Sequence, residues 1–232
     1  MTEEIKFNIF RPVNLNTIFE IPEDRSIWVK NPRYIKNESK NCVPNRDYFL
    51  KSSELLIPRN KKTKDYFKKN SVTNYGIYIL IFNDFKKFYV GVAARYSYIK
   101  DGSLREIKKP EGFLTRLRKH RAKCTGTFYN ISHTNTKPYG WRDLALERVK
   151  LYAEKKKTDT MSDCLLSLIL FENHENYEDN DKGILEEIEH YINNNGISKY
   201  FGEDYSDYES FAHTNPKGLK FIPKFEMKNF SF

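Results

Sequence analysis

Hydrophobic positions in the second third of the chain and beyond follow two spacings, one typical of strands and one typical of helices. Residues 76–82, 87–92 and 164–171 are short apolar runs rich in β-branched and aromatic side chains, which predicts buried strands. Turn-forming residues at 83–86 separate the first two runs, so we expect these two strands to form a hairpin.

Helical spacing follows in other stretches of the same region. Phe113, Leu117 and His120 fall on one face at spacings of four and three, which is typical of an amphipathic helix. We expect helices at 113–123, 141–155 and 184–193. From residue 75 the predicted order is therefore β, β, α, α, β, α. This order predicts an α+β fold with a small antiparallel or mixed three-stranded sheet flanked by helices.

The regions on either side of this pattern differ from it in composition. Residues 1–70 are polar and hold five of the nine prolines, so we expect an N-terminal extension of short strands and loops. Residues 71–196 form the predicted core. Residues 197–232 are rich in aromatic side chains and are predicted to pack on the core as loops and a short strand.

The overall composition excludes several classes of protein. With 39% hydrophobic and 15% aromatic residues, the chain has enough apolar material for a packed core and does not resemble a disordered protein. Its three cysteines are widely spaced, which argues against a disulfide framework and a cysteine zinc site. No apolar run has the length of a membrane span and no apolar signal segment begins the sequence, so we expect a cytoplasmic protein without a membrane partner.

Charge is segregated along the chain. The net charge is +9, and residues 95–123 contain ten basic and three acidic side chains, a local excess of +7. Residues 172–189 contain eight acidic side chains and one lysine, a local excess of −7. Such runs often belong to solvated surfaces, but a basic stretch also suits a polyanionic partner.

Several polar and aromatic residues recur in an order that points to chemistry. The first predicted strand begins Gly-Ile-Tyr and contains Tyr78, the second contains Tyr-Val-Gly beginning at Tyr89, and the next helix places Arg116 four residues before His120. Over residues 74–195 this order resembles the GIY-YIG nuclease family. The resemblance implies a metal-dependent enzyme that hydrolyses phosphodiester bonds in DNA.

The resemblance also implies a role for each of these residues. Tyr78 would deprotonate or orient the attacking water, and Tyr89 would position the phosphate or the water. Arg116 would neutralise charge on the phosphoryl oxygens. His120 would hydrogen-bond the phosphate, protonate the leaving oxygen or hold Tyr78. The remaining cations of this helix are expected to contact the DNA backbone or to have no specific role: Arg118, Lys119, Arg121 and Lys123.

The family also places a metal-binding glutamate on a later helix, which implies Mg²⁺ or Mn²⁺ as cofactor. In this sequence Ile188 occupies the position obtained by counting from the family pattern, and Glu187 and Glu189 flank it. Both stay candidates, and we favour Glu189 because Leu185 and Ile192 lie one turn away from it on either side.

Residues 94–112 are an apparent insertion between the second tyrosine and the arginine, and the insertion is basic. This arrangement resembles the stand-alone type II restriction endonucleases of the family, which implies a homodimer acting on double-stranded DNA. Two alternatives remain open. One is a phage-defence or phage-encoded nuclease of low sequence specificity, and the other is a non-catalytic nucleic-acid-binding module.

Overall fold

A computed structural model gives the fold of the chain in a series of segments. It describes residues 4–21, 28–30, 42–44, 56–67, 75–83, 86–94, 96–98, 104–106, 112–124, 164–172, 181–211 and 219–231. At residues 28–30, 42–44, 96–98, 104–106, 119, 122–124 and 181–182 it describes the backbone alone. The predicted helix at 141–155 and most of the acidic stretch at 172–181 lie outside the described residues.

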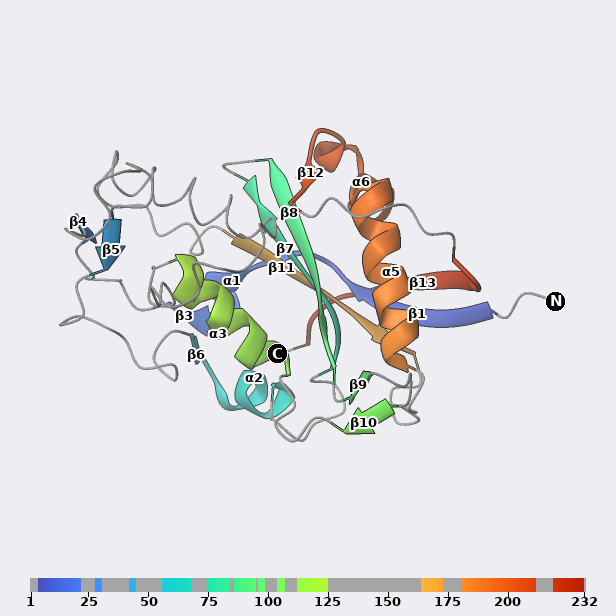
Figure 1. Cartoon of the computed structure of the whole chain (residues 1–232), viewed down its shortest axis with the longest axis horizontal. Coiled ribbons are helices and arrows are strands. Elements are labelled where there is room, and N and C mark those ends of the chain that lie inside the picture. Colours follow the sequence, from blue (N-terminus) through green and yellow to red (C-terminus); the bar gives the residue numbers. More distant parts are fainter. Residues whose placement is uncertain are drawn as a thin grey trace.

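The centre of the fold is a mixed sheet of seven strands in the order β12-β8-β7-β11-β1-β13, with β2 also pairing with β11 (Figure 1). Neighbours are antiparallel from β8 to β1, while β1–β13 and β12–β8 are parallel. The strands are β1 (Glu4–Phe10), β2 (Val13–Asn14), β7 (Gly76–Phe82), β8 (Lys87–Ala93), β11 (Cys164–Phe171), β12 (Glu209–Ser210) and β13 (Ile222–Lys228).

The α+β class is confirmed, and the three strands predicted from apolar runs are the adjacent strands β8, β7 and β11. The expected number of three strands is wrong, because both ends of the chain add strands to this sheet. β1 lies between β11 and β13, so part of the N-terminal extension is a central strand. Its alternating burial, with Phe7 and Ile9 fully inside, explains why it pairs there.

Two helices cover opposite faces of the sheet, α3 (Phe113–Cys124) and α5 (Asp181–Asn195) (Figure 1). Side chains of β7 alternate between these faces. One apolar cluster joins β7 to the α3 side and contains Tyr78, Leu80, Phe82, Phe113 and Leu117. The other joins β7 to the α5 side and contains Ile77, Ile79, Ile81, Leu185, Ile188 and Ile192.

The remaining elements are short. In the N-terminal region they are α1 (Leu15–Ile18), β3 (Phe19–Glu20), β4 (Trp28–Lys30), β5 (Cys42–Pro44), β6 (Ile57–Pro58) and α2 (Lys61–Tyr66). In the predicted insertion β9 (Tyr96–Tyr98) and β10 (Leu104–Glu106) pair antiparallel, so this segment contains its own hairpin-like pair. The tail contains α6 (Ser198–Phe201), the short helix η7 (Glu203–Tyr205), β12 and β13. None of the described helices has the length and apolar character that crossing a bilayer requires.

Candidate functional site

Two glycines allow the β7–β8 hairpin to pack closely at the site. Gly91 lies opposite Tyr78 in the antiparallel register, and a Cβ at Gly91 would lie 2.4 Å from the Tyr78 hydroxyl oxygen. Gly76 has φ +148°, and a Cβ there would lie 2.5 Å from the carbonyl oxygen of Ile169. Because any larger residue would collide with these atoms, the two motif glycines are steric requirements of the fold.

The space above Gly91 is filled by the Tyr78 side chain, which is hydrogen-bonded in the interior. The Tyr78 hydroxyl oxygen lies 2.7 Å from Nε2 of His120 on α3. Tyr78 and His120 are 2% and 4% exposed, so both side chains are withdrawn from bulk water. Burial of either polar group without a partner would be unfavourable, so this hydrogen bond helps to hold both side chains in place.

A third ring completes this group. The Tyr89 ring centroid is 6.0 Å from that of Tyr78 and 5.0 Å from that of His120. Phe113, at the start of α3, meets Tyr78 edge-on at 6.3 Å between ring centroids. Aromatic rings at such distances restrict one another's rotation, so the two hydroxyl-bearing rings are fixed relative to the imidazole.

The helix α3 carries the polar residues to the sheet with its own apolar anchors. Phe113 and Leu117 are fully buried against the sheet, and the amide of Arg116 donates to the carbonyl of Gly112 to begin the helix. His120 follows Arg116 by four residues, which places the two on the same helix face. Arg116 is half-buried. The predicted pair therefore lies together on the helix that covers Tyr78.

The pKa of Tyr78 reports which charged groups lie near it. Burial raises the pKa of the phenol well above its ordinary value of 10.0, and Tyr89 raises it further. The guanidinium of Arg116 lowers this pKa, whereas the carboxylate of Glu189 raises it. Tyr78 is therefore a neutral phenol near neutral pH, with a cation and a carboxylate within electrostatic range.

The two candidate glutamates of α5 have different surroundings. Glu187 accepts a hydrogen bond from the backbone amide of Lys220 at 3.3 Å and forms an ion pair with its ammonium group at 3.5 Å. Glu189 lies two residues later, about 200° around the helix. Its carboxylate raises the pKa of Tyr78. Of the two, Glu189 is the glutamate that the structure associates with the tyrosine site.

The described residues contain no group of three or more histidine, cysteine, aspartate or glutamate side chains that could hold a metal ion. The expected site has a single protein carboxylate, and such a site does not form a cluster of this kind. The half-buried Glu189 is the carboxylate that raises the pKa of Tyr78.

Two other basic residues of α3 are partly or fully withdrawn from the surface. Arg118 donates to the carbonyl of Leu56 from Nε at 3.2 Å and from Nη2 at 2.9 Å, and burial lowers its pKa. Arg121 is 0% exposed, so its side chain is withdrawn from the surface. The N-terminal segment around Leu56 meets α3 at Arg118. The side chains of Lys119 and Lys123 lie outside the described residues.

The sequence interpretation missed two features that shape the site. The first is the contact of Gly91 with both tyrosines, since a Cβ there would also lie 2.8 Å from Cε1 of Tyr89. The hairpin register was the available signal, because it places a glycine opposite an aromatic side chain. The second is Leu56, whose carbonyl anchors α3 and for which the sequence offers no signal.

Together these residues can move a proton and bind an anion. A buried phenol shares a hydrogen bond with an imidazole, while an arginine and a carboxylate lie within range of the phenol. No protein-family model, curated protein sequence or solved structure matches this chain.

Proposed function

We propose that this chain is a metal-dependent endonuclease of the GIY-YIG type that hydrolyses phosphodiester bonds in double-stranded DNA. The observation that carries the proposal is the buried hydrogen bond between Tyr78 and His120, with Tyr89 packed on both rings. Arg116 and Glu189 act on the same phenol. Phosphodiester hydrolysis requires activation of water and neutralisation of phosphoryl charge, and these residues supply groups for both.

The raised pKa of Tyr78 determines how it serves as a base. A free phenolate is disfavoured at this buried position, so we propose a relay rather than a prior ionisation. The attacking water gives its proton to the Tyr78 oxygen as the phenolic proton passes to Nε2 of His120. The oxygen of the resulting hydroxide forms the new bond to phosphorus as the bond from phosphorus to the leaving sugar oxygen breaks. The imidazole becomes an imidazolium, and the leaving oxygen takes a proton from water. This transfer requires Nε2 to be the unprotonated nitrogen beforehand.

Arg116 and Tyr89 would act on the phosphate. The guanidinium of Arg116 presents a planar array of donors that matches two phosphoryl oxygens, and it carries a fixed positive charge. The packing of Tyr89 on Tyr78 and His120 orients its ring beside the proton relay. Its hydroxyl would hold the attacking water or a phosphoryl oxygen in line.

The metal requirement rests on Glu189. Glu189 is half-buried and raises the pKa of Tyr78, and carboxylate oxygens are ligands that Mg²⁺ and Mn²⁺ prefer. Glu189 would hold the ion, with water and the substrate phosphate completing its coordination. When bound, such an ion lowers the pKa of water and stabilises negative charge on the phosphoryl oxygens.

Among nucleases of this type, we propose a type II restriction endonuclease that acts as a homodimer on palindromic sites. Support for this subtype comes from the basic insertion at 94–112, which leaves room for recognition contacts without a further domain.

The direct test is incubation of the purified chain with Mg²⁺ and plasmid DNA. Discrete fragments support restriction, a smear supports a nuclease of low specificity, and a retarded but intact plasmid supports a binding module. We expect Tyr78→Phe to lower the cleavage rate by about 10²–10⁴-fold, the range for loss of a general base.

A matched control is Tyr200→Phe, which also removes a phenolic hydroxyl from a partly buried ring. Tyr200 packs against Phe225 at 5.0 Å on the α5 side of the sheet, away from α3. This variant should cleave DNA at the wild-type rate. Full activity in Tyr78→Phe, or no cleavage by the wild type with either Mg²⁺ or Mn²⁺, would overturn the proposed function.

A further inference from the structure

Within the described part of the chain, the outer edge of β13 is a row of backbone groups that no strand pairs with. β13 ends the sheet, and among the described residues no strand pairs with its outer side. The amide of Arg11 donates to the carbonyl of Lys228 at 2.9 Å, so the backbone groups of Lys228 point toward β1. Because the direction of these backbone groups alternates along a strand, the backbone groups of Pro223, Phe225 and Met227 point away from β1. Pro223 thus stands where its missing N–H removes no hydrogen bond to β1.

The side chains of β13 also alternate, between an apolar and a charged face. Phe225 and Met227 pack into the apolar cluster beneath α5. The opposite face presents Ile222, Lys224, Glu226 and Lys228. Ile222 is 52% exposed, more than any other large hydrophobic side chain of the described residues.

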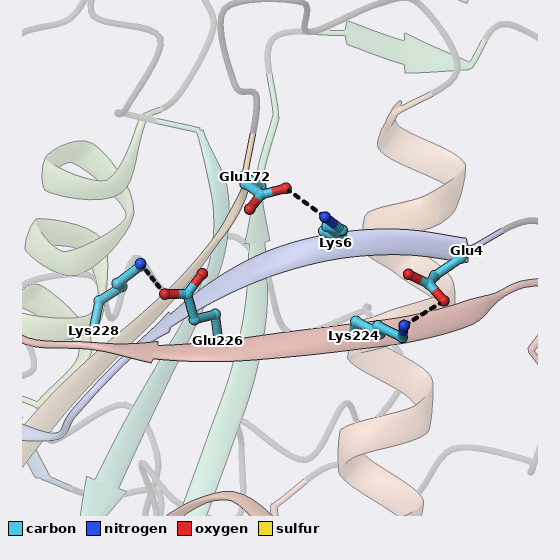
Figure 2. Close-up of polar contacts among 6 residues, drawn as sticks. All are labelled: Glu4, Lys6, Glu172, Lys224, Glu226 and Lys228. Atoms are coloured by element: carbon cyan, nitrogen blue, oxygen red, sulfur yellow. Dashed lines mark hydrogen bonds and ion pairs between the residues drawn. The ribbon is translucent and has the colours of Figure 1, made fainter.

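Figure 2 shows the ion pairs on the charged face. Lys224 lies 2.6 Å from Glu4 on β1, and Lys228 pairs with Glu226 within β13. On the neighbouring strands Lys6 lies 3.7 Å from Glu172. The charges along β13 therefore alternate in sign, lysine, glutamate, lysine, at every second residue.

We propose that β13 pairs with β13 of a second copy of this chain, antiparallel, about a two-fold axis at Phe225. In this register Lys224 of each copy lies opposite Glu226 of the other, and Phe225 lies opposite itself. The two Phe225 residues exchange both backbone hydrogen bonds, and each Met227 N–H donates to the carbonyl of Pro223 across the axis. Lys224 and Glu226 form the non-hydrogen-bonded pairs, in which facing side chains are closest.

Charge selects this register over its neighbours. A shift of two residues places either Lys224 opposite Lys224 or Glu226 opposite Glu226, and like charges directly opposite are unfavourable. A shift of one residue places outward backbone groups of one strand against inward groups of the other, and brings polar side chains onto the apolar face. The chosen register also sets Ile222 against the aliphatic stem of Lys228, which can cover it.

The same features explain why the occupant is a second copy rather than an unrelated strand. Lysine and proline on an edge strand usually oppose pairing with foreign strands. The order Lys-Phe-Glu at 224–226 is complementary to its own reversal, so the strand accepts itself in antiparallel orientation. β13 contributes no side chain to the cluster that holds α3 and Tyr78, so pairing at its edge does not change that cluster. The dimer therefore does not depend on the reaction at that site.

The test is sedimentation of the full chain over a concentration series, with charge reversals at the pair. Glu226→Lys gives two lysine–lysine oppositions in the dimer, and Lys224→Glu gives two glutamate–glutamate oppositions. We expect each variant alone to dimerise at least about tenfold more weakly than the wild type. An equimolar mixture of the two restores both attractive pairs and should form a heterodimer of wild-type affinity.

Glu172→Lys is the matched control, since it makes the same charge change and breaks one exposed ion pair beside β13. It should dimerise as the wild type does. A wild type that stays monomeric at about 100 µM, well above the Kd of a micromolar interface, would overturn the proposal. Variants that dimerise unchanged, or a mixture that forms no heterodimer, would overturn it as well. Because the mixture rescues two separately purified variants, misfolding of either one cannot imitate the expected result.

Discussion

The side chains on the two faces of strand β7 are equally buried but differ in the contacts they make. On the α5 side Ile77, Ile79 and Ile81 are each 0% exposed and make apolar contacts with that helix. On the α3 side the same strand places Tyr78, 2% exposed, in a hydrogen bond with His120. Burial alone thus does not distinguish a packing face from a chemical one. The distinguishing feature is a pair of interior polar groups that satisfy each other across two elements.

This difference has an energetic cause. An apolar side chain gains free energy from burial in any orientation that fills the space. A buried phenol or imidazole loses its hydrogen bonds to water and needs a partner in one geometry. The α3 face is therefore specified by distances and angles, whereas the α5 face is specified mainly by volume. Mutations on the two faces should separate stability from activity.

The largest effect is expected on the apolar face. Ile79→Ala removes buried carbon atoms from the cluster beneath α5 and should lower the free energy of unfolding by about 2–5 kcal/mol. The cleavage rate per folded molecule should stay at the wild-type value, because Tyr78 points to the other face. Urea unfolding followed by circular dichroism gives the first quantity and plasmid cleavage gives the second. A loss of activity greater than the loss of folded protein would contradict the separation of the faces.

The next prediction compares how much the two glutamates of α5 contribute to the cleavage rate. Glu189→Gln should lower the cleavage rate by about 10²–10³-fold, a loss of about 2.7–4 kcal/mol of transition-state stabilisation. Glu187→Gln makes the same change at a residue held by Lys220, and should cleave DNA at close to the wild-type rate. Rates are measured at saturating Mg²⁺. A larger loss in Glu187→Gln than in Glu189→Gln would reverse the assignment.

A smaller effect on the free energy of unfolding tests the geometry of the α3 face. Gly91→Ala places a methyl group 2.4 Å from the Tyr78 hydroxyl oxygen, so Tyr78 must shift within a packed interior at about 1–3 kcal/mol. Gly196→Ala meets no atom within 4 Å but has φ +79°, so it should lose about 1 kcal/mol through backbone strain alone. Only Gly91→Ala should also abolish cleavage. Normal cleavage by that variant would show that the Tyr78 position is not critical.

Most of the sheet centre and the two helices that cover it, α3 and α5, were predictable because their patterns are local. Runs of β-branched and aromatic residues defined β7, β8 and β11 to within one residue, and apolar spacing defined α3. β1 and β13 were missed as sheet members, because their half-buried alternation is weaker and their pairing joins opposite ends of the chain. Sequence patterns carry no direct record of such distant pairing.

The sequence selected the residues of the candidate site but not the contacts between them. Tyr78, Tyr89, Arg116 and His120 were selected from the order of motifs, and the structure brings the three rings together. The choice between the two glutamates of α5 needed the position of Lys220, a residue from the tail. The contact of Arg118 with Leu56, more than fifty residues earlier in the chain, is one that no helical pattern reveals.

The smallest effect is a pH dependence to which Tyr78 on the α3 face contributes. Tyr78 has its pKa raised well above 10.0, mainly by burial, while an unfolded tyrosine titrates near 10. Above about pH 10 the unfolded chain therefore loses a proton that the folded chain keeps. The unfolded state then binds fewer protons, so stability is fully present below about pH 10 and falls as the pH rises toward the folded pKa.

One such group lowers stability by at most about 1.4 kcal/mol per pH unit in this window. Unfolding of wild type and Tyr78→Phe should be measured in urea between about pH 9 and pH 11. The variant should lose less stability over this range, because it lacks one of the tyrosines that resist ionisation. Ile79→Val, on the apolar face, should lose as much as the wild type does. If Tyr78→Phe follows the wild-type slope, the phenol ionises without cost in the folded protein, and the relay through His120 loses its physical reason.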